Sequence, residues 1–74
     1  MTGFEFKVIQ KYTIEGKDNL KTTKEAEVTT FFCDDFIKSV VPIPDDEKKC
    51  LLLTVTGTLV CLEPYQDVVK RLLN

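Results

Sequence analysis

Three cysteines are the side chains best suited to chemistry in this sequence of 74 residues, which contains no histidine. Cys33, Cys50 and Cys61 are separated by gaps of 17 and 11 residues. A zinc site needs about four Cys or His ligands in closely spaced pairs, so the sequence predicts no metal and no other cofactor. Cys50 follows Lys48-Lys49, which would lower its pKa, whereas Cys61 is expected to act as a small buried apolar residue.

Two acidic clusters, Asp34-Asp35 and Asp45-Asp46-Glu47, are the other candidates for chemistry. Neither has the alternating spacing of a calcium loop, and carboxylates commonly stabilise turns by accepting backbone hydrogen bonds. The chain also lacks a glycine-rich phosphate loop, and without histidine it lacks the commonest general base. The sequence therefore favours a protein that is not an enzyme and has no small-molecule substrate.

Composition indicates one ordinary globular domain, residues 1–74. Apolar residues make up 43%, and 10 basic residues against 12 acidic ones give a net charge of −2. This balance excludes a strongly basic protein that coats DNA. No apolar run approaches the roughly 18 residues of a membrane span. The first residues lack a signal-peptide pattern, so we expect a cytoplasmic protein with reduced thiols and no membrane contact.

Alternation of apolar and polar residues predicts an N-terminal hairpin. Residues 4–14 and 26–32 have the period of two that is typical of strands, and the polar segment Glu15–Lys24 is expected to be the loop between them. Eleven residues at about 3.3 Å each would span about 36 Å. A strand of that length is long for so small a domain, so we expect a bend or an overhanging end.

The second half of the sequence predicts further strands and one helix. A strand that includes Ile37, Val41 and Ile43 should be an edge strand or one that ends early, because Pro42 cannot donate to a ladder. Asp45–Lys49 should be a charged loop. Thr56-Gly57 predicts a tight hairpin turn in which Leu53 faces Val60. After Pro64, apolar residues recur at helical spacing. They are Tyr65, Val68, Val69, Leu72 and Leu73. The predicted fold is α+β, a small bent antiparallel β-meander of four or five strands with one C-terminal amphipathic helix.

The last hairpin is apolar on both faces, which is typical of strands that are covered on both sides. One helix of about ten residues is roughly 15 Å long and covers only one face. Either the N-terminal hairpin closes a small barrel over the second face, or another molecule covers it. The expected contact residues are Leu52, Thr54, Leu59 and Cys61, with Ile9 and Phe31. The sequence thus predicts a protein-interaction or assembly module that binds a second copy or another protein; a small bacterial or phage accessory protein would fit.

An alternative function rests on the uneven distribution of charge. Residues 1–24 have a net charge of +2, and the remaining fifty have −4. A basic hairpin can follow a phosphate backbone while aromatic side chains stack on bases. The candidate residues for such a nucleic-acid-binding regulator are Lys7, Lys11, Lys17, Lys21 and Lys24, with the aromatic residues Phe4, Phe6 and Tyr12.

From Val28 to Leu73, 46 of the 74 residues, the chain resembles the short FlbD-like proteins of flagellar operons. The similar features are Phe31-Phe32, Asp34-Asp35, Ile37–Val41, Pro44-Asp45, Leu51–Gly57, Leu59–Glu63 and Asp67-Val68-Val69. The chain departs from that pattern in its additional N-terminal strand, in Thr56 where the family tends to have Asn, and in its cysteines. The resemblance implies a meander followed by a helix, with no catalytic residues.

Overall fold

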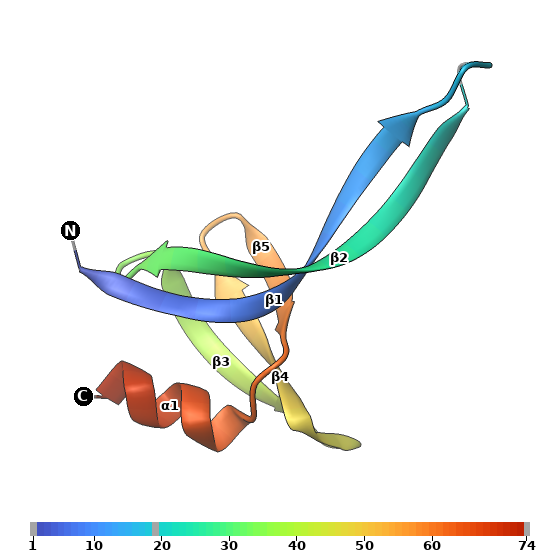
Figure 1. Ribbon diagram of the computed structural model, residues 1–74. Coiled ribbons are helices and arrows are strands. Elements are labelled where there is room, and N and C mark those ends of the chain that lie inside the picture. The colour runs from blue at the N-terminus through green and yellow to red at the C-terminus, as the bar shows by residue number, and fades with distance from the viewer. Residues whose placement is uncertain (1, 19, 74) are drawn as a thin grey trace.

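The computed structural model describes residues 2–18 and 20–73, which form five strands followed by one helix (Figure 1). The strands are all antiparallel and form one sheet, so the fold is α+β and mostly sheet, as predicted. The elements are β1 (Gly3–Glu15), β2 (Lys21–Cys33), β3 (Ile37–Ile43), β4 (Asp46–Thr54), β5 (Gly57–Cys61) and α1 (Tyr65–Leu73).

The order of strands in the sheet is β2-β1-β5-β4-β3, which differs from a simple meander. Strands β3, β4 and β5 do follow one another, but β2 does not pair with β3. Instead β1 pairs with β5, where Val8 lies opposite Cys61 and Ile9 lies opposite Val60. The N-terminal hairpin is therefore joined to a three-stranded meander through its first strand.

The link between β2 and β3 requires the sheet to roll up. In a flat sheet these two edge strands would lie four spacings apart, about 19 Å. The link contains only Asp34, Asp35 and Phe36, and the Phe36 amide donates a hydrogen bond to the Cys33 carbonyl at 2.9 Å. A chain of four residues spans at most about 14 Å. The two edges must consequently approach each other at this end, and the sheet has a concave inner face and a convex outer face.

The core fills the concave inner face. Its buried residues come from β1, β2, β4, β5 and α1; they are Phe6, Val8, Phe32, Cys50, Leu52, Cys61 and Val68. Three aromatic contacts link Phe4 to Phe6, Phe6 to Phe32 and Phe32 to Phe36, and the two ring centroids in each contact are 6.0 to 6.3 Å apart. Both the base of the N-terminal hairpin and the helix thus contribute to covering the same face of the sheet.

Helix α1 packs against β3 and β4 with the predicted apolar stripe. Val68 is buried, and Tyr65, Val69 and Leu72 are half-buried, whereas Leu73 is 80% exposed at the helix end. The packing is reinforced by Arg71, whose guanidinium lies 4.5 Å from the centre of the Phe6 ring and 3.3 Å from a Glu63 oxygen. Glu63 also accepts the Lys7 amide at 3.2 Å. These contacts attach the helix to β1.

Two predicted loops prove to be strands. Lys21–Lys24 belongs to β2, where Glu15 lies opposite Lys21 and Tyr12 opposite Lys24, so cross-strand partners extend the hairpin. Asp46–Lys49 begins β4, and only the preceding Pro44-Asp45 forms the turn. The edge position predicted for the strand that contains Pro42 is confirmed, because β3 is the last strand in the sheet order.

The β4–β5 register differs from the predicted one by two residues. Thr54 lies opposite Gly57, so Val55-Thr56 forms the turn, and Leu53 faces Thr58 rather than Val60. The Thr54 hydroxyl stabilises this turn by donating to the Gly57 carbonyl at 2.8 Å and accepting the Thr56 amide at 3.3 Å. A shift of two preserves the alternation of side chains, so the predicted division into two faces is correct.

We expect Gly57→Ala to lower the free energy of unfolding by about 1–2 kcal/mol, because Gly57 has a φ of +148°, which strains any residue with a Cβ. A Cβ there would meet no atom within 4 Å, so the cost is confined to the backbone. Urea denaturation followed by circular dichroism measures this change. Gly16→Ala is the matched control, because its nearest contact, the Leu20 carbonyl at 3.4 Å, is an ordinary one. Equal stability of the two variants would contradict the prediction.

Candidate protein-interaction surface

The β1–β2 hairpin extends beyond the rest of the sheet as a projecting ribbon, seen at the upper right of Figure 1. We call residues 10–18 and 20–26 the arm. Its overhang confirms the expectation from strand length, since β1 pairs with β5 only at Val8 and Ile9. The radius of gyration is 14.2 Å, whereas a compact domain of this length has about 11.3 Å. The arm makes the molecule unusually extended, with dimensions of 49 × 34 × 17 Å.

The two faces of the arm differ in chemistry. The inner face, on the side of the ribbon that carries Val8, includes Tyr12 and Ile14, which are 45% and 42% exposed. Val28 continues this face toward the core and is 40% exposed. A two-stranded ribbon is marginally stable in water by itself, and here the face that carries Tyr12 and Ile14, together with Gln10, Thr22 and Lys24, lies open. This combination is typical of a segment that packs against another molecule.

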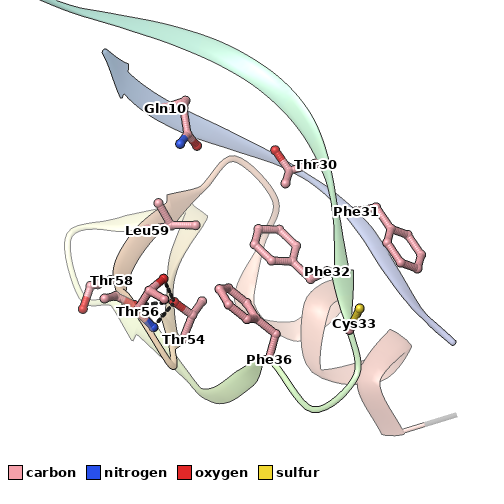
Figure 2. A pocket seen from close by; sticks show the side chains of 11 residues that line it. Gln10, Thr30, Phe31, Phe32, Cys33, Phe36, Thr54, Thr56, Thr58 and Leu59 are labelled. Atoms are coloured by element: carbon pink, nitrogen blue, oxygen red, sulfur yellow. Dashed lines mark hydrogen bonds between the residues drawn. The ribbon is translucent and has the colours of Figure 1, made fainter. Parts of the chain in front are cut away.

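A hollow lies where the arm meets the body of the protein (Figure 2). We call it the inner hollow; its volume is about 420 Å³. Figure 2 shows Phe32, Phe36 and Leu59 directed toward it, while Phe31 points away. The side chains that line it carry no formal charge. They come from β1, β2, the β2–β3 link and the β4–β5 hairpin: Gln10, Thr30, Phe31, Phe32, Cys33, Phe36, Thr54, Thr56, Thr58 and Leu59, with the backbone of Gly57.

Two of the predicted contact residues, Leu52 and Cys61, are fully buried inside the chain and cannot contact a partner while it is folded. The reason is that Val8 pairs with Cys61, which places the base of β1 and the helix over this face. The face selected from the sequence is therefore largely the core face. Thr54 and Leu59, from the same predicted set, are half-buried and line the inner hollow.

The other two predicted contact residues lie on the convex outer face. Ile9 pairs with Val60 there and is half-buried. Phe31 is 48% exposed, and its ring lies over Gly3, where a Cβ would come within 2.7 Å of it. The structure thus does not bring the six predicted residues onto one surface. Tyr12 and Ile14, which the structure leaves exposed on the arm, were not in the predicted contact set, although the excess length of their strand was a signal.

Two of the five lysines proposed for nucleic-acid binding face acidic side chains across the arm. Four of the five, Lys11, Lys17, Lys21 and Lys24, lie on the arm, and Lys7 lies nearer the body. The Lys11 ammonium is 3.9 Å from Glu25, and Lys21 lies directly opposite Glu15. Phe6 is fully buried, so it cannot stack on a base. The acids beside Lys11 and Lys21 reduce the positive field on this side of the arm.

The buried cysteines form a cross-strand pair. Cys50 lies opposite Cys61, and both are fully buried. Burial, aided by the neighbouring Cys61 and Glu63, raises the pKa of Cys50 to about 12, and burial also raises the pKa of Cys61. The expectation that Lys48-Lys49 would lower the pKa of Cys50 is therefore wrong, because removal from water outweighs those exposed or half-exposed charges. The burial expected for Cys61 is confirmed.

The acidic clusters act in turns. Asp46 accepts the Lys48 amide at 3.0 Å and pairs with the Lys49 ammonium at 3.8 Å, and Asp34 accepts the Thr2 hydroxyl at 2.7 Å. The Asp46 contact agrees with the predicted bonding to a nearby backbone amide, whereas Asp34 lies in the β2–β3 turn but bonds a hydroxyl that is distant in the sequence. Within residues 2–18 and 20–73, no three His, Cys, Asp or Glu side chains gather in a way that could hold a metal ion.

The part of the chain that the structure describes contains no helix with the length and apolar character needed to cross a bilayer. No protein-family model, no curated protein and no solved structure matches this chain. The resemblance to the short FlbD-like proteins accordingly stays a prediction.

Proposed function

We propose that this chain is a non-enzymatic assembly module that binds a second copy of itself through the arm. The observation that carries the proposal is the open inner face of the arm, where Tyr12 and Ile14 are exposed and which Val28, also exposed, continues toward the core. An exposed apolar patch on a small soluble domain usually marks a contact site.

The amount of surface supports a partner of similar size. The chain exposes 5661 Å², whereas a compact monomer of its mass exposes about 4,650 Å². The excess is about 1,000 Å², and a standard protein interface covers about 800 Å² on each partner. The arm accounts for this excess because its two strands are exposed on both faces. One interface with a second chain would lower the exposed surface area of each chain to about that of a compact monomer.

Stability favours the same conclusion. Only seven described residues are buried apolar residues, and domains of this size often gain stability from a partner subunit. A second copy is the partner that is always present where the chain is present. Association of identical chains with two-fold symmetry needs only one self-complementary patch, which makes it the commonest form of assembly.

Light scattering across a concentration series tests the proposal. We expect the measured mass to rise from 8.5 kDa toward twice that value as concentration increases. Ile14→Asp should lower the association constant at least tenfold, because it would place a carboxylate in the buried apolar contact. The chain should remain folded, since Ile14 is 42% exposed in the single chain.

Thr13→Asp is the matched control for this experiment. Thr13 is exposed and lies on the opposite side of the same strand, so its replacement should leave association unchanged. A chain that stays monomeric at every concentration, or an Ile14→Asp variant that associates like the wild type, would contradict the proposal.

A further inference from the structure

We infer that the arm of one copy enters the inner hollow of the other, so that two arms exchange between the chains of a symmetric dimer. This inference rests on the proposed function and adds the site that receives the arm. The occupant of each hollow is the inner face of the second copy's arm, which carries Tyr12 and Ile14.

The chemistry of the inner hollow suits that occupant. Its side chains carry no formal charge, and Phe32, Phe36 and Leu59 give it an apolar floor. Inserting Tyr12 and Ile14 there removes apolar surface from water on both partners, and Lys24, which lies opposite Tyr12 on the same face, can keep its ammonium in water at the rim. Its volume of about 420 Å³ lies within the range of sites that hold small organic molecules, so it can hold bulky side chains of the arm.

The two halves of strand β1 also have the equal lengths that an exchange of arms between two chains requires. Gly3–Val8 lies over the body, and Gln10–Glu15, a segment of the same length, projects from it. The inner hollow begins at Gln10, at the base of the arm, and extends past Thr30, which lies opposite Phe6 over the body, to Cys33 and Phe36. A two-fold axis near Gln10 therefore brings each arm alongside the hollow of the other chain. The contact is self-complementary, as a closed dimer demands.

The overall charge of the two parts is compatible with this arrangement. Residues 10–26 have a net charge of +1, and the rest of the chain has −3. The Cys33 and Phe36 end of the hollow is bordered by the exposed Asp34 and Asp35. With the axis near Gln10, the tip of the arm that meets this turn carries Lys17 and Lys21 with Glu15 and Asp18 and has no net charge. The opposite signs of the whole arm and the rest of the chain favour their association.

Cross-linking between two differently tagged chains tests the inference. One chain carries Ile14→Cys on the arm and the other carries Thr56→Cys at the rim of the hollow, both with Cys33→Ser to remove the half-buried native thiol. Cys50 and Cys61 are buried and should not react with the cross-linker. A chain that carries only Cys33→Ser measures any cross-linking through these two thiols. A short bismaleimide should join the two tagged chains, and circular dichroism verifies that each variant folds.

Thr13→Cys replaces Ile14→Cys in the control, because Thr13 lies on the other side of the arm. We expect its cross-linked yield to be at least tenfold lower. A dimer by light scattering that gives no mixed product, or gives equal yields from positions 13 and 14, would overturn the arm-in-hollow arrangement while leaving self-association intact. A chain that is monomeric by light scattering would overturn both.

Discussion

Leu52→Asp is expected to unfold the protein. Leu52 is completely buried among Phe6, Val8 and Val68, and removing a buried leucine side chain alone costs about 2–5 kcal/mol. The aspartate adds an unpaired carboxylate in an apolar core. The total free energy of unfolding for a chain of this length is about 4–11 kcal/mol. The variant should therefore lose its cooperative urea transition and its β-sheet circular dichroism spectrum.

Val55→Asp provides the comparison, because Val55 is 53% exposed in the turn of the same hairpin. We expect its stability to stay within about 0.5 kcal/mol of wild type. This pair of variants separates a core position from a contact position. A folded Leu52→Asp chain that merely loses the ability to associate would show that Leu52 belongs to the interface, as the sequence suggested, and not to the core.

The second large effect concerns the thiols. At pH 8 and in dilute solution, we expect iodoacetamide to label Cys33 about a thousandfold faster than Cys50. The thiolate is the reactive form, and its fraction falls about tenfold for each unit by which the pKa rises above the usual value near 8.5. Burial raises the pKa of Cys50 to about 12, whereas Cys33 is only half-buried. Mass spectrometry of peptides after timed labelling measures the three rates.

Unfolding in urea is the control for labelling, because all three thiols should then react at similar rates.

A pH dependence of stability accompanies this prediction. The raised pKa means that the folded chain keeps thiol protons that the unfolded chain releases, so stability is fully present below about pH 9 and falls as the pH rises toward 12. Rapid labelling of Cys50 in the native chain would contradict the burial of the cross-strand pair.

Local patterns in the sequence were sufficient to predict the elements. The alternation in residues 4–14 and the spacing of Val68 and Leu72 depend only on near neighbours, and both the strand and the helix were found. The length of β1 was also enough to predict that the strand bends or extends beyond the sheet. The β4–β5 register was wrong by two because the Thr54 hydroxyl stabilises a turn one residue earlier than the glycine suggested.

The covered face of the last hairpin could not be predicted in the same way. Leu52 and Leu59 on one side resemble Leu51 and Leu53 on the other, so composition gives no preference. The pairing of Val8 with Cys61, a contact between distant parts of the chain, decides which face of the last hairpin is covered. Leu52 and Cys61 were for this reason assigned to a contact surface, although they belong to the core. The open arm, with Tyr12 and Ile14, is a consequence of the same pairing, because β5 is too short to accompany β1 along its full length.

The pairing of β1 with β5 also governs when the chain can fold during its synthesis. Val8 and Cys61 are 53 residues apart, and the helix that completes the core follows still later. The first hairpin therefore leaves the ribosome long before the strand and helix that cover its apolar base. Closing so distant a contact is slow compared with forming a local hairpin. The newly made N-terminal half must stay soluble during this time. The lysines along its unpaired strand edge disfavour aggregation of nascent chains.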